Sequence, residues 1–452
     1  MTNGRSIAPW LRLPPLAKSI ATPANKREPE TPIPMNARVT SADLAKIAAL
    51  LATAVIMLLA NGLQGTLVPV RAHYEGFSST AISFMGAAYF AGFVAGCVLC
   101  PRLIERVGHI RTFAVLGAIT GAIVLGHALV VGPIVWGVFR AGIGFCAAGM
   151  FAVLEGWLNQ SAGNAIRGRI FTMYAAFNNL ALLGGQYLFT LSDPRSHILF
   201  SICTILTLFC LIPVGMTTQS EPPRAGVAKL RLARLYRLSP VGVIGAIAVG
   251  LTSGAFWTLA PVFAESRGMS GDGVALFMAV VIFGGAAAQW PLGRLSDFTD
   301  RRQIIGIAAA AAAFAGVVLA VEAPFGIDAQ VWLLAGGMLY GATAFPVGSL
   351  TNAHLNDHAR QEEMTEFASS NLFVYGTAAA IGPVVAAGVI YVGGLSAIFF
   401  FTAAMHAGFV AFVLYRMVVR APLPAEDRGA FEVELVQPAP MHMAPEPAVA
   451  KD

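Results

Sequence analysis

Twelve apolar runs of roughly 20 residues, with few charged residues among them, divide this sequence, and they restrict its fold more than any other feature. About 20 residues of α-helix are needed to cross the ~30 Å hydrocarbon core of a bilayer. A helix also pairs its own backbone N–H and C=O groups, which the bilayer core requires. The sequence therefore predicts an all-α membrane protein with twelve transmembrane helices. The predicted spans are residues 47–70, 79–101, 112–131, 134–158, 169–191, 198–216, 241–264, 273–293, 303–321, 329–355, 367–392 and 395–415.

Composition supports this class. Hydrophobic residues make up 56% of the chain and charged residues 12%, whereas soluble domains carry about 25% charged residues.

All five cysteines fall inside predicted spans, and the C-x-x-C pair of Cys97 and Cys100 has no His or acidic neighbours that would complete a metal site. We expect these cysteines to pack as small apolar residues. We expect no metal and no cofactor.

The distribution of basic residues predicts the orientation. If both termini are cytoplasmic, all but four of the 29 Lys and Arg lie inside, as the positive-inside bias requires. The exceptions are Arg71, Arg195 and Arg267, which would face outside, and Arg140, which lies within a span. The net charge of +5 is therefore a topology signal and does not indicate binding of nucleic acid. We expect a multi-pass protein of the bacterial inner membrane, working as a monomer in the lipid bilayer.

An internal repeat divides the chain. Shifting the sequence by 192 residues aligns Thr66-Leu67-x-Pro69 with Thr258-Leu259-x-Pro261. The same shift pairs Gly76 with Gly268, Ser78 with Ser270, Gly92 with Gly284, Arg102 with Arg294 and Glu105 with Asp297. The repeat predicts two pseudo-symmetric halves of six spans each. The expected parts are a disordered tail at 1–43, a first bundle at 44–216, a basic linker at 217–240, a second bundle at 241–418 and a disordered tail at 419–452, with Met1 or Met35 as the start.

Two parallel halves resemble the architecture of major facilitator transporters, which implies a solute site between the halves and alternating access. The loops PRLIERVGHIR (101–111) and GRLSDFTDRR (293–302) are similar to the G-x-L-x-D-R-x-G-R-R loop of that family, although Pro101, Glu105 and Asp300 depart from it. Carboxylates and arginines at helix ends can bind neighbouring helix termini and so close one side of the membrane. A solvated basic turn is the alternative. The matching residues are Arg102, Glu105, Arg106 and Gly108 in the first loop and Gly293, Asp297, Arg301 and Arg302 in the second.

Arg140 is the clearest charge inside a span, where a charged side chain is costly and usually functional. The segment around it is similar to the family's R-x-x-x-G-x-x-A-A motif through Arg140, Gly144, Ala147 and Ala148. That resemblance implies a role in coupling to protons or substrate. A structural arginine bonded to carbonyls is the alternative.

Glu155 lies fifteen residues after Arg140, about 22 Å farther along the same helix and within about 60° of its direction. Both side chains can face one cavity, but they cannot pair. Arg167 and Arg169 at the start of the next span are the nearest partners in sequence. We expect Glu155 to form part of a cytoplasmic gate with them, and a static loop clamp is the competing interpretation.

Two further segments resemble the YcaD-like group of bacterial major facilitator proteins over residues 44–418. The first has E-x-W-L-N followed by R-G and Tyr174, with Gly156 where relatives often carry Ser. The second, residues 353–383, has the A-H-x-N-D, Y-G and G-P pattern of the group. The resemblance implies transport of a small solute that it does not identify.

Polar residues within the spans are candidates for the solute cavity, although hydrogen bonds between helices explain such residues equally well. We expect Tyr89, His127 and His406 to be packing residues. The candidates are Asn61, Gln64, Asn178, Gln186, Trp257, Gln289, Ser349, Asn371 and Tyr375.

The sequence therefore favours a secondary transporter of a small solute, most simply driven by protons. A drug or metabolite efflux antiporter is one alternative, and a non-transporting receptor or scaffold is another. An enzyme is not expected, because helix termination explains His354, Asp357 and His358 better than a metal site does, and no G-x-x-x-x-G-K-[ST] loop is present to bind ATP phosphates.

Overall fold

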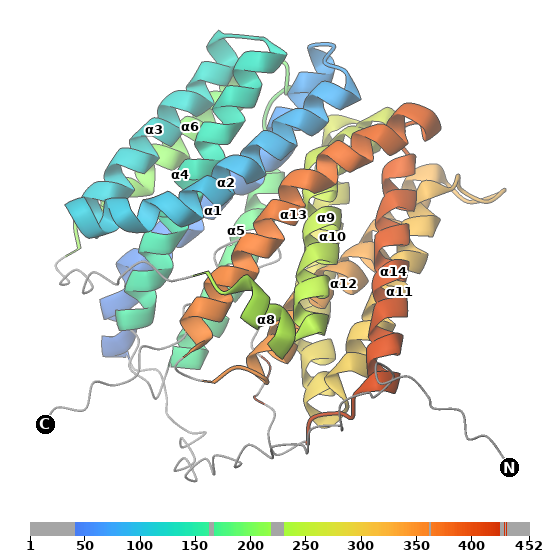
Figure 1. Cartoon of the computed structure of the whole chain (residues 1–452). Coiled ribbons are helices and arrows are strands. Elements are labelled where there is room, and N and C mark those ends of the chain that lie inside the picture. Colours follow the sequence, from blue (N-terminus) through green and yellow to red (C-terminus); the bar gives the residue numbers. More distant parts are fainter. Residues whose placement is uncertain are drawn as a thin grey trace, which may run out of the picture. The chain divides into compact units, whose positions relative to one another are not determined.

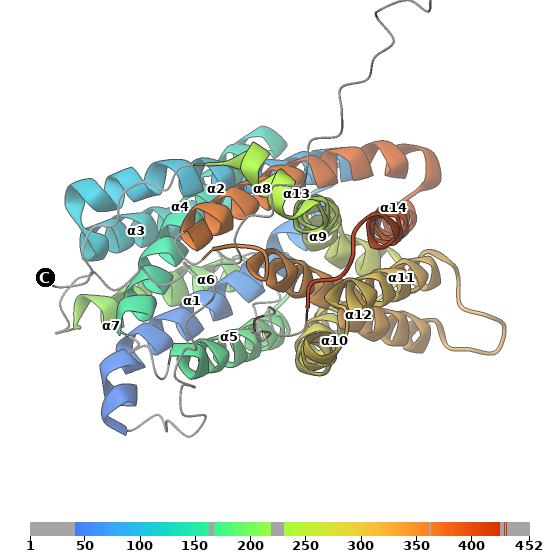
Figure 2. The same cartoon turned by 60° about the horizontal axis from the view of Figure 1, so that its bottom comes forward.

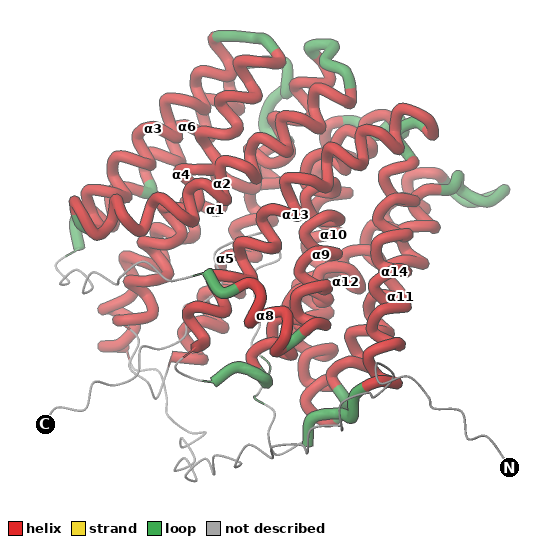
Figure 3. The backbone as a smooth tube through the Cα atoms, in the orientation of Figure 1, coloured by secondary structure: helices red, strands yellow, loops and turns green. Residues whose placement is uncertain are grey.

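The computed structural model describes residues 41–161, 167–217, 230–360, 363–424, 429 and 431, which all belong to one compact unit of the chain. Within these residues helices and their connecting loops make up the structure (Figure 3). The predictions for residues 1–40 and for most of the linker and the C-terminal tail fall outside the described residues.

The first six predicted spans are all helical. The sixth is interrupted at Cys210, so α6 and the short α7 together make one apolar stretch, Ile198–Gly215. The helices are α1 (Ser41–Tyr74), α2 (Ser79–Val107), α3 (His109–Leu129), α4 (Pro133–Ser161), α5 (Arg167–Phe189), α6 (Ile198–Phe209) and α7 (Leu211–Gly215).

The last six predicted spans are helical as well, and they follow a short linker helix, α8, whose Leu235 is buried. Arg231 binds Glu366 at 2.6 Å and Arg234 binds Glu363, so the linker is fixed to the start of α13. The helices are α8 (Leu232–Leu238), α9 (Pro240–Ser266), α10 (Gly271–Phe298), α11 (Arg301–Ala320), α12 (Ala329–Asn356), α13 (Met364–Gly393) and α14 (Ala397–Val419).

Eleven helical stretches of the described chain are long and apolar enough to cross a membrane. The remaining predicted span, α5, is more polar, since it carries Asn178, Asn179 and Gln186 and begins with two arginines. The twelve-helix fold expected from the sequence is confirmed. The bounds of the two proposed bundles stay a prediction.

Both copies of the internal repeat form the same local structure. Gly76 and Gly268 both have a positive φ, 78° and 83°, which is strained for any residue with a Cβ. Two residues later, Ser78 and Ser270 cap α2 and α10 by accepting a hydrogen bond from the backbone N–H three residues on. The repeated sequence signals are therefore repeated turn and cap geometries.

Glycines bring helix backbones into direct contact. A Cβ on Gly92 of α2 would lie 1.9 Å from the carbonyl oxygen of Ala141, and one on Gly144 of α4 would lie 1.9 Å from that of Tyr89. In the second copy, a Cβ on Gly284 of α10 would lie 2.5 Å from the carbonyl oxygen of Met338 in α12. Such close approach is how helices gain packing contacts where lipid removes the hydrophobic force between them.

The first six spans meet the last six along two seams. Figures 1 and 2 show α2 beside α13 and α5 beside α10. We call the end of the helices next to α8 and Gly108 the linker end, and the end with the Gly76 and Gly268 turns the far end. At the far end, His73 Nε2 lies 2.9 Å from Glu265 Oε2, which joins α1 to α9.

We predict that Gly144→Ala lowers the melting temperature of the detergent-purified protein by several degrees. Its new methyl group would meet the Tyr89 carbonyl, and overpacking of this kind costs about 1–3 kcal/mol. Gly137→Ala on the same helix is the control, since a Cβ there has no neighbour within 4 Å. Equal melting temperatures for the two variants would contradict the close approach of α2 and α4.

Candidate functional site

A pocket lies between the first and last six spans, with walls from α1, α2, α4 and α9. It brings together three of the residues selected from the sequence, Asn61, Arg140 and Trp257. These residues are distant in the sequence and come from three different helices. The complete lining is Asn61, Gly65, Tyr89, Phe90, Arg140, Trp257 and Thr258.

Arg140 enters this pocket above an aromatic ring. Its guanidinium carbon lies 4.4 Å from the centroid of Tyr89, a cation–π contact. The sequence analysis treated Tyr89 as a packing residue, and Tyr89 is indeed buried in the hydrophobic core, but it also lines the pocket beneath Arg140. The sequence contained a signal for this contact in Gly92 of α2 and Gly144 of α4, the two glycines at which these helices meet. Tyr89 lies three residues before Gly92, and Arg140 lies four residues before Gly144.

Trp257 is held in place by other aromatic rings. Its indole stacks on Phe345 of α12 at 5.6 Å and 12°, and it meets Phe256 edge-on at 5.5 Å and 83°. Its Nε1 is buried and has no hydrogen-bond partner among the described residues. The pocket wall therefore includes a fixed aromatic face with an unused N–H donor.

Two of the predicted cavity residues bond between helices instead. Gln186 of α5 accepts a hydrogen bond from Thr66 at 2.7 Å and donates one to the carbonyl of Gly62 at 3.0 Å, which ties α5 to α1. Asn371 of α13 donates to Asn352 of α12 at 2.8 Å. For these two residues the structure therefore shows hydrogen bonding between helices, the alternative to a place in the solute cavity. The other candidates, all at least partly buried and outside this pocket's lining, are Gln64, Asn178, Gln289, Ser349 and Tyr375.

Glu155 is almost fully buried near the linker end of α4, with 4% of its surface exposed. Its Oε1 accepts a hydrogen bond from the Tyr174 hydroxyl of α5 at 3.3 Å. Of its two expected partners, Arg169 is exposed on α5 and the Arg167 side chain lies outside the described residues. The gate with these arginines stays a prediction. Tyr174 was recognised in the sequence only as part of a family pattern, and the structure shows it as a partner of Glu155.

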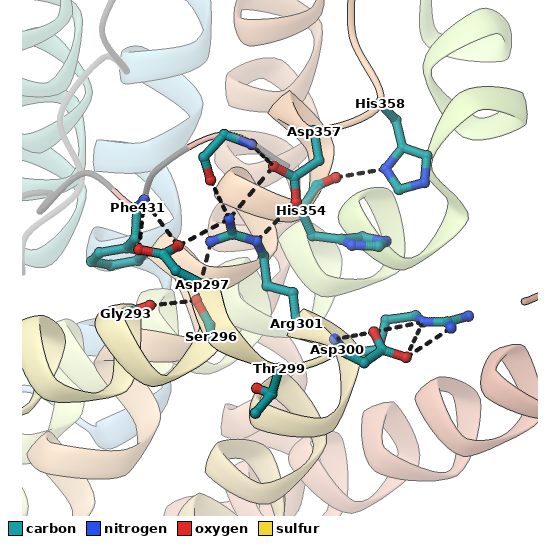
Figure 4. A network of polar contacts seen from close by, with 12 residues as sticks. Gly293, Ser296, Asp297, Thr299, Asp300, Arg301, His354, Asp357, His358 and Phe431 are labelled. Carbon is teal, nitrogen blue, oxygen red and sulfur yellow. Dashed lines mark hydrogen bonds and ion pairs between the residues drawn. The ribbon is translucent and has the colours of Figure 1, made fainter. Parts of the chain in front are cut away.

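The second loop motif forms a buried charge network centred on Arg301 (Figure 4). Arg301 donates from Nε to Asp357 Oδ2 at 2.8 Å and from Nη2 to Asp297 Oδ1 at 3.2 Å. Its Nη1 donates to the Ser296 hydroxyl at 3.1 Å, and that hydroxyl donates to the carbonyl of Gly293 at 2.6 Å. One guanidinium therefore joins the linker ends of α10, α11 and α12.

Arg302 makes a second set of contacts beside this network. Its Nη2 donates to Asp300 Oδ2 at 2.8 Å and its Nη1 donates to the carbonyl of Arg420 at 2.8 Å, at the end of α14. Asp300 also caps α11, because its Oδ1 accepts the backbone N–H of Arg302 at 3.1 Å. The residue that departs from the family loop, Asp300 in place of Gly, therefore has a structural role as a helix cap.

Two residues of the C-terminal tail bind the same network. The carbonyl of Gly429 accepts from Arg301 Nη2 at 2.6 Å, and its N–H donates to Asp357 Oδ1 at 2.9 Å. The N–H of Phe431 donates to Asp297 at 3.1 Å, as Figure 4 shows, and its ring covers Gly293, where a Cβ would come within 2.0 Å of it. The sequence analysis treated residues 419–452 as a disordered tail and gave no sign of these contacts.

Burial changes the titration of the groups around this network. It raises the pKa of Asp357, against the opposing effects of the Arg301 charge and the Gly429 N–H. It lowers the pKa of His358, and the Arg420 charge adds to that effect. His358 Nδ1 lies 2.9 Å from the carbonyl of His354, and the described residues contain no group of three or more His, Cys, Asp or Glu side chains that could hold a metal.

The first loop motif differs from the second in its surroundings. Arg102, Glu105 and Arg106 are all exposed, and no described ion pair includes them. Gly108, with a φ of 92°, turns the chain from α2 into α3. The two copies are similar in sequence, but among the described residues the ion pairs involve the second copy and not the first.

We predict that Arg301→Gln lowers the free energy of unfolding by about 3–5 kcal/mol, because it leaves the buried Asp357 without its cation. Thermal or denaturant unfolding of the purified protein would measure the loss. Arg294→Gln is the control, since Arg294 is exposed on α10 and contacts only the Trp290 ring among the described interactions. Adding Asp357→Asn to Arg301→Gln should recover part of the stability, and a double variant less stable than the single one would contradict the pairing.

Comparison with known proteins shows which family this chain resembles. The family model of the Major Facilitator Superfamily matches residues 50–383 and 242–448. An uncharacterized MFS-type transporter YcaD of Escherichia coli is 25% identical over 342 residues, 74% of this chain and 86% of the relative. The protein of that name from Escherichia fergusonii is 28% identical over 266 residues, 57% of this chain and 68% of the relative.

Solved structures share the fold at low sequence identity. The nucleoside transporter NupG aligns with a TM-score of 0.67 at 13% identity, over 83% of this chain and 99% of that one. A D-xylose-proton symporter aligns with a TM-score of 0.63 at 16% identity, over 86% and 100% of the two chains. The family match extends over most of the sequence and the fold agrees with it, so this multi-pass membrane protein belongs to the Major Facilitator Superfamily of transporters.

Proposed function

We propose that this protein is a secondary transporter that carries a small solute across the bacterial inner membrane by alternating access, with both termini in the cytoplasm. The observation that carries the proposal is the pocket between the two sets of six spans. Its walls come from both sets, and it holds an arginine well inside α4. A rocking motion of one set against the other would expose such a pocket to each side in turn.

The contacts at the two ends of the helices support a motion of this kind. The far end is joined across the seam by His73 and Glu265, a partly exposed pair that can break at small cost. At the linker end, the charges of the first loop motif have no ion-pair partner among the described residues. These residues are therefore available for contacts in a second state that is closed at the linker end.

Glu155 is our candidate for coupling to protons. It is a carboxylate inside a span, it is buried, and its Oε1 accepts a hydrogen bond from the Tyr174 hydroxyl. A carboxyl group in this position can hold or release a proton when the bond to Tyr174 breaks. One of the structural neighbours is a D-xylose-proton symporter, which agrees with proton coupling in this fold and leaves the solute open.

The test is solute counterflow and proton-driven uptake in liposomes, screened with amino acids, sugars, organic acids and nucleosides. We expect at least one solute to exchange. In an efflux antiporter, protons that flow inward would instead drive the solute outward. A receptor would bind a ligand without exchange.

We predict that Glu155→Gln slows proton-driven uptake several-fold or more and leaves counterflow largely intact, because an amide cannot take up or release a proton. Tyr174→Phe should have a smaller effect in the same direction, because it removes one hydrogen bond and keeps the carboxylate. Both variants should keep the wild-type melting temperature. Equal loss of uptake and of folded protein would indicate a static clamp instead of a coupling residue.

A further inference from the structure

Arg140 has no carboxylate partner in the part of the chain that the structure describes. None of the ion pairs among the described residues includes it, and its one described side-chain contact is the Tyr89 ring. Glu155 lies fifteen residues farther along α4, about 22 Å away. Glu265 at the far end of α9 is bound to His73.

An unpaired guanidinium inside a membrane protein needs an explanation. Arginine stays charged under all ordinary conditions, and a charge at this depth is costly. A tyrosine ring compensates only part of that cost. The guanidinium lies in the wall of the pocket between the two sets of spans, so a ligand in the pocket can supply the missing negative charge.

The other walls restrict the rest of the ligand. Tyr89, Phe90 and Trp257 give the pocket an aromatic lining, and the pocket lining contains no Asp or Glu. The buried Nε1–H of Trp257 is a second donor without a described partner. Thr258 already donates its hydroxyl proton to the carbonyl of Gly254 at 2.7 Å, so its oxygen remains an acceptor.

We propose that the solute is an organic monoanion, a carboxylate on an aromatic or aliphatic body, and that Arg140 binds the carboxylate. The planar fork of a guanidinium matches the two oxygens of a carboxylate. One unpaired cation in the pocket fits one negative charge, and the aromatic walls fit an apolar body. The inference rests on the proposed transport function, and it opposes a cationic drug as the solute, because Arg140 would repel it.

The test is ligand binding to the purified protein by thermal shift and titration calorimetry. Two matched sets share a body and differ in charge: 3-phenylpropanoate, 3-phenylpropanamide and 3-phenylpropylamine, and hexanoate, hexanamide and hexylamine. We expect the acids to bind about 10- to 100-fold more tightly than the amides, as a charge-assisted hydrogen-bond pair provides. The amines should bind least.

Arg140→Gln should weaken binding of the acids by a similar 10- to 100-fold and leave the weak binding of the amides unchanged. Arg140→Lys should lie between, because it keeps the charge and loses the fork. Arg237→Gln is the control, since Arg237 is exposed on α8 and is not part of the pocket lining. Melting temperatures without ligand show whether each variant folds. If Arg140→Gln does not fold, Arg140→Lys tests the proposal in its place.

Three results would overturn the proposal: tighter binding of the amines, acid binding that survives Arg140→Gln, or no acid binding at millimolar concentration. Counterflow in liposomes separates this proposal from the transport function. Exchange of an amide or amine, without exchange of the acids, would support the transport function and contradict the proposal that the solute is an anion. Acid binding through Arg140 without any exchange would support the anion and reject transport.

Discussion

Direct backbone contact between helices at glycines is the constraint on which the rest of this structure depends. In lipid, helices gain little from burying apolar side chains against one another, so they pack by close approach. Gly92 and Gly144 allow α2 and α4 to touch, and Gly284 does the same for α10 and α12. A side chain at Gly92 or Gly144 would separate α2 from α4, and both of these helices form walls of the pocket.

The chemistry of the pocket follows from this packing. The crossing of α2 and α4 fixes Tyr89 on one helix directly beneath Arg140 on the other. The stacking of Trp257 on Phe345 likewise fixes the opposite wall through α12. The residues that line the pocket therefore all belong to helices, and none belongs to a loop.

The sequence predicted the helices well, because twenty apolar residues in a membrane have few alternatives to a helix. It also identified Asn61, Arg140 and Trp257, since polar or bulky residues in apolar spans are conspicuous. It selected Asp297 and Arg301 as part of a loop motif, but it could not predict that Arg301 also binds Asp357 and the C-terminal tail, which are distant in the sequence. It also could not separate Gln186 and Asn371, which bond between helices, from the residues of the pocket, because burial and polarity look the same for both groups.

The two copies of the repeat share their scaffold but not the charged residues of α4. The turn and cap at Gly76 and Ser78 recur at Gly268 and Ser270, yet the positions that match Arg140 and Glu155 hold Trp332 and Val347. Six spans is an even number, so a duplicated gene could join two copies end to end without inverting either one in the membrane. The ancestral unit would then have worked as a pair of identical chains. A fusion of this kind would have allowed each copy to diverge separately: the first carries Arg140 and Glu155 inside α4, and the second carries the network of Arg301.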